Sequence, residues 1–92
     1  MTDREHIPWR QRDSHKDLVL ELRVLRRENK GADRGVLTQQ IRVRHRDGRI
    51  LLDREVTLHW RHFGQIDAAF SDLGDAVVVT SSDGRDRIWT LD

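Results

Sequence analysis

The sequence has no cysteine, no tyrosine and one proline, and its aromatic residues are three tryptophans and two phenylalanines. The absence of cysteine excludes disulfides, thiolate metal sites and a cysteine nucleophile. No apolar run approaches the roughly 18 residues of a membrane-spanning helix. The first 16 residues are polar and charged, unlike a secretory signal. We therefore expect a cytoplasmic protein.

The 92 residues are enough for one small domain with a modest core. The net charge is only +1, but basic residues dominate positions 1–50 and acidic residues dominate positions 51–92. Either the two halves neutralise each other within one fold, or the molecule has a basic face and an acidic face that favour association.

Residues 1–16 show no hydrophobic periodicity and contain Pro8. This predicts a flexible or extended arm, in which Ile7 and Trp9 could anchor to the body or to a neighbouring subunit. The remaining 17–92 form a single small β-rich domain. In its first segment, 17–28, the side chains follow a period of two, which favours a strand. A helix is the alternative, because Ser14 could cap its start and Gly31 could end it.

Residues 36–46 and 49–60 read as two strands joined at Asp47-Gly48, a dipeptide typical of two-residue hairpin turns. A two-residue loop places Val43 opposite Leu52, Arg42 opposite Asp53, Gln40 opposite Glu55 and His45 opposite Ile50. It also places Arg54 opposite the apolar Ile41. This mismatch requires a bulge or a partner for the guanidinium group.

Residues 65–73 carry Ile66, Ala69, Phe70 and Leu73 at helical spacing, which predicts a short helix and leaves a strand as the alternative. A second hairpin over 76–82 and 86–91 turns at Asp83-Gly84, and Trp89 then faces Val78 or Val79. The fold class is mainly β (α+β): a five-stranded antiparallel meander with this one helix near 65–73. The predicted shared core contains Val43, Leu52, Phe70, Val77, Val79 and Trp89.

The C-terminal third carries a pattern of short motifs in a fixed order: Phe70-Ser71, Gly74, an apolar strand, Ser81, Asp83-Gly84 and Arg87-Ile88-Trp89. Over about residues 62–90 it resembles a single blade of a WD-repeat β-propeller, with Thr90 in place of the usual aspartate. The resemblance implies a strand at 65–73 and an interaction scaffold. A lone blade leaves both sheet faces uncovered, so it also implies assembly of several chains.

Four arginines lie along one strand and its turn, namely Arg42, Arg44, Arg46 and Arg49. Alternate strand residues are about 6.7 Å apart, close to the phosphate spacing of a nucleic-acid strand. The alternative is that these arginines lie on a solvent-exposed face and bind no nucleic acid, with Arg42 paired to Asp53. His59 and His62 would point to opposite faces of a strand, so no shared metal is expected. No catalytic signature or cofactor motif is present.

These observations favour a non-catalytic binding module with a protein-interaction, assembly or inhibitor role. The candidate partner-binding residues are Trp9, Trp60 and the four arginines. The alternative is a nucleic-acid-binding protein that uses the arginine ladder. The partner is a protein or a second copy of the chain, and we expect a homo-oligomer, most simply a dimer, through an unpaired edge at 17–28.

Overall fold

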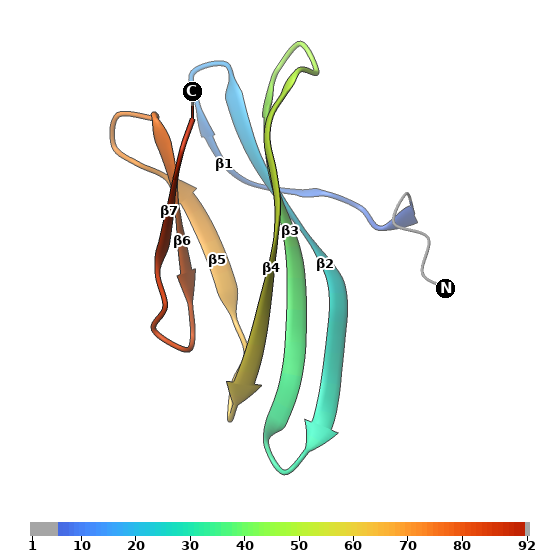
Figure 1. Ribbon diagram of the computed structural model, residues 1–92. Coiled ribbons are helices and arrows are strands. Elements are labelled where there is room, and N and C mark those ends of the chain that lie inside the picture. Colours follow the sequence, from blue (N-terminus) through green and yellow to red (C-terminus); the bar gives the residue numbers. More distant parts are fainter. Residues whose placement is uncertain (1–5, 92) are drawn as a thin grey trace.

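The computed structural model describes residues 6–91, which form two antiparallel sheets and no α-helix (Figure 1). One sheet has the order β1-β2-β3-β4 and the other the order β5-β6-β7. The mainly β prediction is confirmed, whereas the five-stranded meander is wrong. The strands are β1 Arg10–His15, β2 Leu18–Gly31, β3 Arg34–His45, β4 Ile50–Arg61, β5 Ile66–Phe70, β6 Ala76–Ser81 and β7 Arg87–Thr90.

The short helix predicted at 65–73 is wrong, because Ile66–Phe70 is strand β5 and a turn follows it. Ile66 and Phe70 are four residues apart, a spacing that suits one helical face and one strand face equally. Ala68, between them, is buried on the same side of the strand. Leu73, which completed the helical pattern, is 82% exposed in the turn.

The strand predicted at 17–28 is confirmed as β2, but it is not the free edge expected from the sequence. Residues 10–15 of the predicted arm form β1, which pairs with β2 from Leu18 to Leu22. The rest of β2 has no strand on that side within the described chain. Residues 1–5 of the predicted arm lie outside the described residues.

The β2–β3 hairpin contains a tight turn that the sequence did not reveal. Gly31 pairs directly with Arg34, and the two residues between them, Ala32 and Asp33, have φ values of 51° and 59°. Positive φ at both central positions is the requirement of a type I′ turn, which Asn-Gly satisfies best. Neither alanine nor aspartate adopts this conformation without a steric cost.

Replacing Ala32 with asparagine and Asp33 with glycine is expected to raise the free energy of unfolding by about 1 kcal/mol, because both residues then tolerate positive φ. Urea denaturation of the two proteins measures the difference. Ala69→Gly, on the exposed face of β5, is the control and should destabilise, since glycine weakens a strand. An Asn-Gly variant no more stable than the wild type would contradict the turn assignment.

The hairpin at Asp47-Gly48 is confirmed, and the predicted register holds from Gln40 to Val43. Near the turn the register shifts, so that Ile50 pairs with Arg44 and the predicted pair with His45 is wrong. The loop is longer than two residues because only Gly48, with φ 103°, has positive φ. The Asp47 carboxylate accepts a hydrogen bond from the Arg49 N–H instead.

The hairpin at Asp83-Gly84 is also confirmed, but both predicted registers are wrong. Trp89 pairs with Val77, because the loop extends beyond the dipeptide. The Gly84 N–H donates to the Ser81 carbonyl, and the Asp83 carboxylate accepts from the Arg85 N–H. Both Asp-Gly turns therefore use the aspartate side chain to bind the second N–H after it.

The apolar core lies between the two sheets. All six residues predicted to share one core belong to the buried cluster or pack against it, which confirms that prediction. Arg54 keeps its predicted place opposite Ile41 without a bulge. Its guanidinium group lies 5.7 Å from the centre of the Trp89 ring on β7, and this contact is the partner that the mismatch required.

The two sheets are joined along β1 and β5. The Arg12 guanidinium group makes two hydrogen bonds, of 2.5 and 2.7 Å, to the Asp67 carboxylate. The Asp13 carboxylate accepts from the backbone N–H of Phe70 at 2.9 Å. These contacts hold the second half of the chain beside the N-terminal strand, so that β1 forms part of the domain.

Candidate functional site

The predicted arginine ladder lies on the outer face of the four-stranded sheet, where two of its members bind one glutamate. Arg42 Nη2 donates to Glu21 Oε2 at 2.6 Å, and Arg44 Nε donates to Glu21 Oε1. Glu21 is only 5% exposed. Asp53 stands opposite Arg42 in register but accepts its hydrogen bond from Gln40 Nε2. The ladder is thus partly neutralised from within the sheet.

Burial alone would raise the pKa of the Glu21 carboxyl, because it disfavours the charged form. Hydrogen bonds from Arg42 and Arg44, and the positive charge of both, outweigh that effect and lower the pKa below its ordinary value. Glu21 is therefore ionised at neutral pH, and its charge compensates the two guanidinium groups.

The segment before β1 crosses this outer face, as Figure 1 shows. The guanidinium groups of Arg23 and Arg42 lie 4.3 and 4.0 Å from the centre of the Trp9 ring. The Ile7 carbonyl accepts a hydrogen bond from Arg23 Nη1 at 3.3 Å. Trp9 and Ile7 therefore anchor the N-terminal segment to the body of the domain, one of the two roles foreseen for them.

The other two predicted ladder residues lie at the β3–β4 turn and are exposed. The backbone N–H of Arg46 donates to the Asp17 carbonyl at 2.9 Å, which joins this turn to the β1–β2 turn. Arg49 is the last residue before β4. The structure thus divides the predicted row of four into a pair bound to Glu21 and a pair exposed at the end of the sheet.

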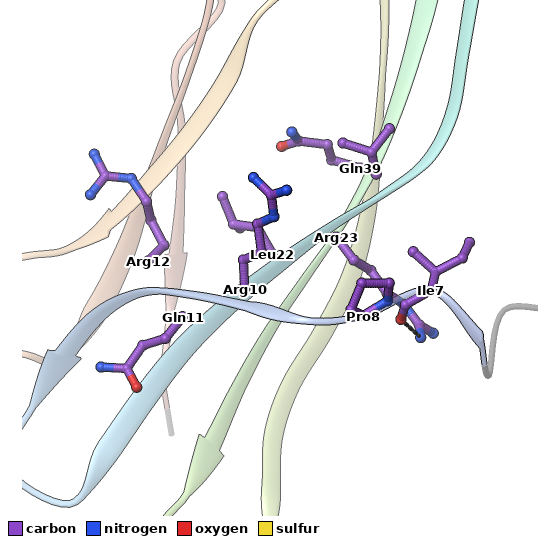
Figure 2. Close-up of a pocket in the computed structure, with 9 residues that line it drawn as sticks. Ile7, Pro8, Arg10, Gln11, Arg12, Leu22, Arg23 and Gln39 are labelled. Carbon is purple, nitrogen blue, oxygen red and sulfur yellow. Dashed lines mark hydrogen bonds between the residues drawn. The ribbon is translucent and has the colours of Figure 1, made fainter.

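A cavity of about 440 Å³ lies between the N-terminal segment and β2 (Figure 2). It lies where β1 begins, at the pair of Arg10 with Leu22, and where the part of β2 without β1 beside it starts. Its floor includes the apolar side chains of Leu22 and Val24. The complete lining is Ile7, Pro8, Arg10, Gln11, Arg12, Leu22, Arg23, Val24 and Gln39.

One side chain that lines this cavity carries a buried acceptor without a partner. Gln39 Oε1 is buried and makes no hydrogen bond within residues 6–91. A buried acceptor left unsatisfied costs about 1–3 kcal/mol. Periodicity does not reveal this feature, because Gln39 lies 15 residues from Val24 along the chain and is opposite it only in the sheet.

Trp60, the last predicted candidate, packs against the core from the far end of β4. A Cβ atom on either Gly35 or Gly64 would overlap its indole ring. Its neighbour His59 stays within β4, whereas His62 lies beyond the end of that strand. Among the residues that the structure describes, no three histidine, aspartate or glutamate side chains gather as metal ligands.

Comparison of the chain with protein-family models, with curated proteins and with solved structures found no match. The resemblance of residues 62–90 to a WD-repeat blade stays a prediction. Within residues 6–91, no helix is long and apolar enough to cross a membrane.

Proposed function

We propose that this protein is a non-catalytic binding module that takes an acidic, extended protein segment along the free edge of β2. The observation that carries the proposal is the run from Arg23 to Gly31, which continues beyond the end of β1 with no strand beside it in the described chain. An extended segment adds to such an edge through main-chain hydrogen bonds. β4 and β7 are also edge strands, but the main cavity adjoins β2.

The chemistry of this edge favours an acidic occupant. Residues 23–31 carry four basic side chains and one acidic side chain. Glu28, the acidic one, is bonded to Arg26 at 2.7 Å, which leaves Arg27 and Lys30 for a partner. The register also shifts between Val24 and Arg26. Basic residues and bulges both discourage pairing between identical edges, so a second copy of β2 is disfavoured here.

The cavity supplies the specificity that main-chain pairing lacks. An apolar side chain of the bound segment would cover Leu22 and Val24. Arg10 lines the same cavity and forms no ion pair among the described residues. A carboxylate of the bound segment would meet this guanidinium group.

A blocked peptide of alternating threonine and glutamate tests the proposal by NMR. We expect its addition to shift the amide resonances of Arg23–Gly31 and of Gln39. A peptide in which lysine replaces glutamate should shift none of them. Replacing Arg26 and Arg27 with glutamate should weaken binding by about tenfold or more, because both charges then repel the peptide.

Arg49→Glu is the matched control, since it reverses one exposed charge in the β3–β4 turn, away from β2. It should leave the affinity nearly unchanged. Shifts confined to β4 or β7, or equal binding of the lysine peptide, would contradict the assignment to β2.

The alternative function, nucleic-acid binding by the arginine ladder, has less support because Arg42 and Arg44 already bind Glu21. A salt titration distinguishes nucleic-acid binding from binding of the acidic peptide. Phosphate contacts weaken steeply between low and physiological salt, whereas strand addition with an apolar anchor changes much less. Tight, strongly salt-dependent binding of a single-stranded oligonucleotide, without binding of the acidic peptide, would favour the alternative.

A homo-oligomer, most simply a dimer, remains our prediction for the free protein, now through an edge other than β2. β4 presents twelve residues with no strand on its outer side in the described chain, and such edges recruit other strands. Light scattering behind a sizing column at several concentrations measures the mass. A value of 10.9 kDa throughout would contradict the dimer. The cytoplasmic location also remains a prediction, which fractionation of the native host would measure.

A further inference from the structure

A second concavity, of about 360 Å³, lies at the end of the four-stranded sheet that carries the β2–β3 turn. Three neighbouring strands each contribute a basic side chain to it: Lys30 from β2, Arg34 from β3 and Arg61 from β4. The other lining residues are Gly35, Val36, His59 and Trp60. No carboxylate lines this concavity.

The arrangement of these charges is unfavourable in the empty protein. Arg34 and Arg61 stand directly opposite each other on β3 and β4. Like charges in a cross-strand pair destabilise a sheet. Within residues 6–91, neither guanidinium group forms an ion pair, and neither does Lys30. The nearby Glu28 is bonded to Arg26.

A tryptophan held in a fixed position also lines this concavity. Trp60 lines the concavity, and its indole Nε1–H is buried with no partner in the described part of the chain. The ring cannot shift freely, because the backbones of Gly35 and Gly64 lie against it. Three basic side chains without an ion pair, gathered around one concavity that no carboxylate lines, are an arrangement that an oxyanion would satisfy.

We propose that this concavity binds a phosphate group. A phosphate group carries up to two negative charges and three acceptor oxygens, which match the three cations better than a single carboxylate does. Arginine is suited to such planar, paired contacts. The volume lies near the lower end of the range for small-ligand sites, enough for the phosphate and part of the molecule that bears it. This proposal does not depend on the β2 edge function, since the ligand differs and Lys30 is the one residue that the two regions share.

Inorganic pyrophosphate is the probe, added at constant ionic strength and followed by proton–nitrogen NMR. The three tryptophans give three indole signals, and Trp60→Phe assigns the one from Trp60. We expect pyrophosphate to shift the Trp60 signal and to leave those of Trp9 and Trp89 unchanged, and chloride to shift none. Adenosine diphosphate distinguishes the two possible sources of the phosphate group. Tighter binding of adenosine diphosphate than of pyrophosphate indicates a nucleotide, and equal binding indicates a free phosphate.

Arg34→Gln and Arg61→Gln should each weaken pyrophosphate binding by about tenfold, the value of one lost charge-assisted hydrogen bond. Arg49→Gln removes the same charge elsewhere and should change nothing. Thermal unfolding gives a second readout, because a ligand that binds the native state raises the Tm. Pyrophosphate should raise the Tm of the wild type more than that of Arg34→Gln. An unmoved Trp60 signal, or an equal loss in Arg49→Gln, would overturn the proposal.

Discussion

Glutamine in place of Glu21 is expected to lower the free energy of unfolding by about 3 kcal/mol at neutral pH. Removing one partner of a buried ion pair leaves the other charge without compensation, and Glu21 compensates two. The Arg42 and Arg44 side chains are 23% and 32% exposed, so water relieves part of the penalty. Urea denaturation of the variant and the wild type measures the effect.

Glu28→Gln is the matched control, because Glu28 also binds an arginine but its side chain is 46% exposed. The change in its free energy of unfolding should be much smaller than that of Glu21→Gln, because solvent screens surface ion pairs. Equal effects at the two positions would show that burial of the Glu21 network has no energetic consequence.

The effect of Glu21→Gln should also depend on pH. The pKa of Glu21 is lower in the folded protein than in the unfolded chain. Its charge therefore stabilises the fold above the unfolded pKa of about 4.3, and this contribution is lost as pH falls through the folded value. The stability difference between wild type and variant should shrink in acid. A difference that is constant from neutral pH into acid would contradict the assignment.

Alanine in place of Trp89 is expected to lower the free energy of unfolding by about 3 kcal/mol, a large share of the 5–15 kcal/mol of a small domain. The indole ring packs against the core from β7, pairs across from Val77 and carries the Arg54 guanidinium group on its face. Its loss opens a cavity and removes a contact between β4 and β7. Thermal and urea unfolding both report the change.

Ile88→Ala provides the comparison, because Ile88 is the next residue on β7, points away from the core and is 68% exposed. Its substitution should change stability by no more than about 0.5 kcal/mol. Arg54→Ala should fall between the two, at about 1 kcal/mol, the value of a partly exposed cation–π contact. A Trp89→Ala protein as stable as Ile88→Ala would refute the proposed core.

The two candidate binding regions share strand β2 but differ in chemistry. The free edge offers backbone groups and a cavity with apolar lining residues, whereas the concavity at the β2–β3 end offers three basic side chains. Lys30 belongs to both the edge and the concavity. A double titration with the acidic peptide and pyrophosphate would therefore show whether the two ligands compete for it.

The sequence alone determined the features that depend on neighbours in the chain. The alternation in 17–28, 36–46 and 49–60 placed three strands, since side chains of a strand point alternately to opposite faces. The two Asp-Gly dipeptides placed two turns, because glycine tolerates positive φ. Alternation within the predicted strands identified five of the six core residues, including Trp89, and the apolar face of the helix predicted at 65–73 identified Phe70.

Only the tertiary structure decided the features that depend on residues distant in the chain. The choice of strand over helix at Ile66–Phe70 rests on pairing with β6 and on the Asp13 carboxylate that binds Phe70. Likewise Arg42 and Arg44 resemble a free ladder in the sequence, and Glu21, which neutralises both, is more than 20 residues away. Local periodicity predicts the face of a strand on which a side chain lies. The tertiary fold decides which carboxylate or neighbouring strand contacts that face. The partners of these arginines, and the unsatisfied groups of Gln39 and Trp60, were therefore beyond what periodicity could predict.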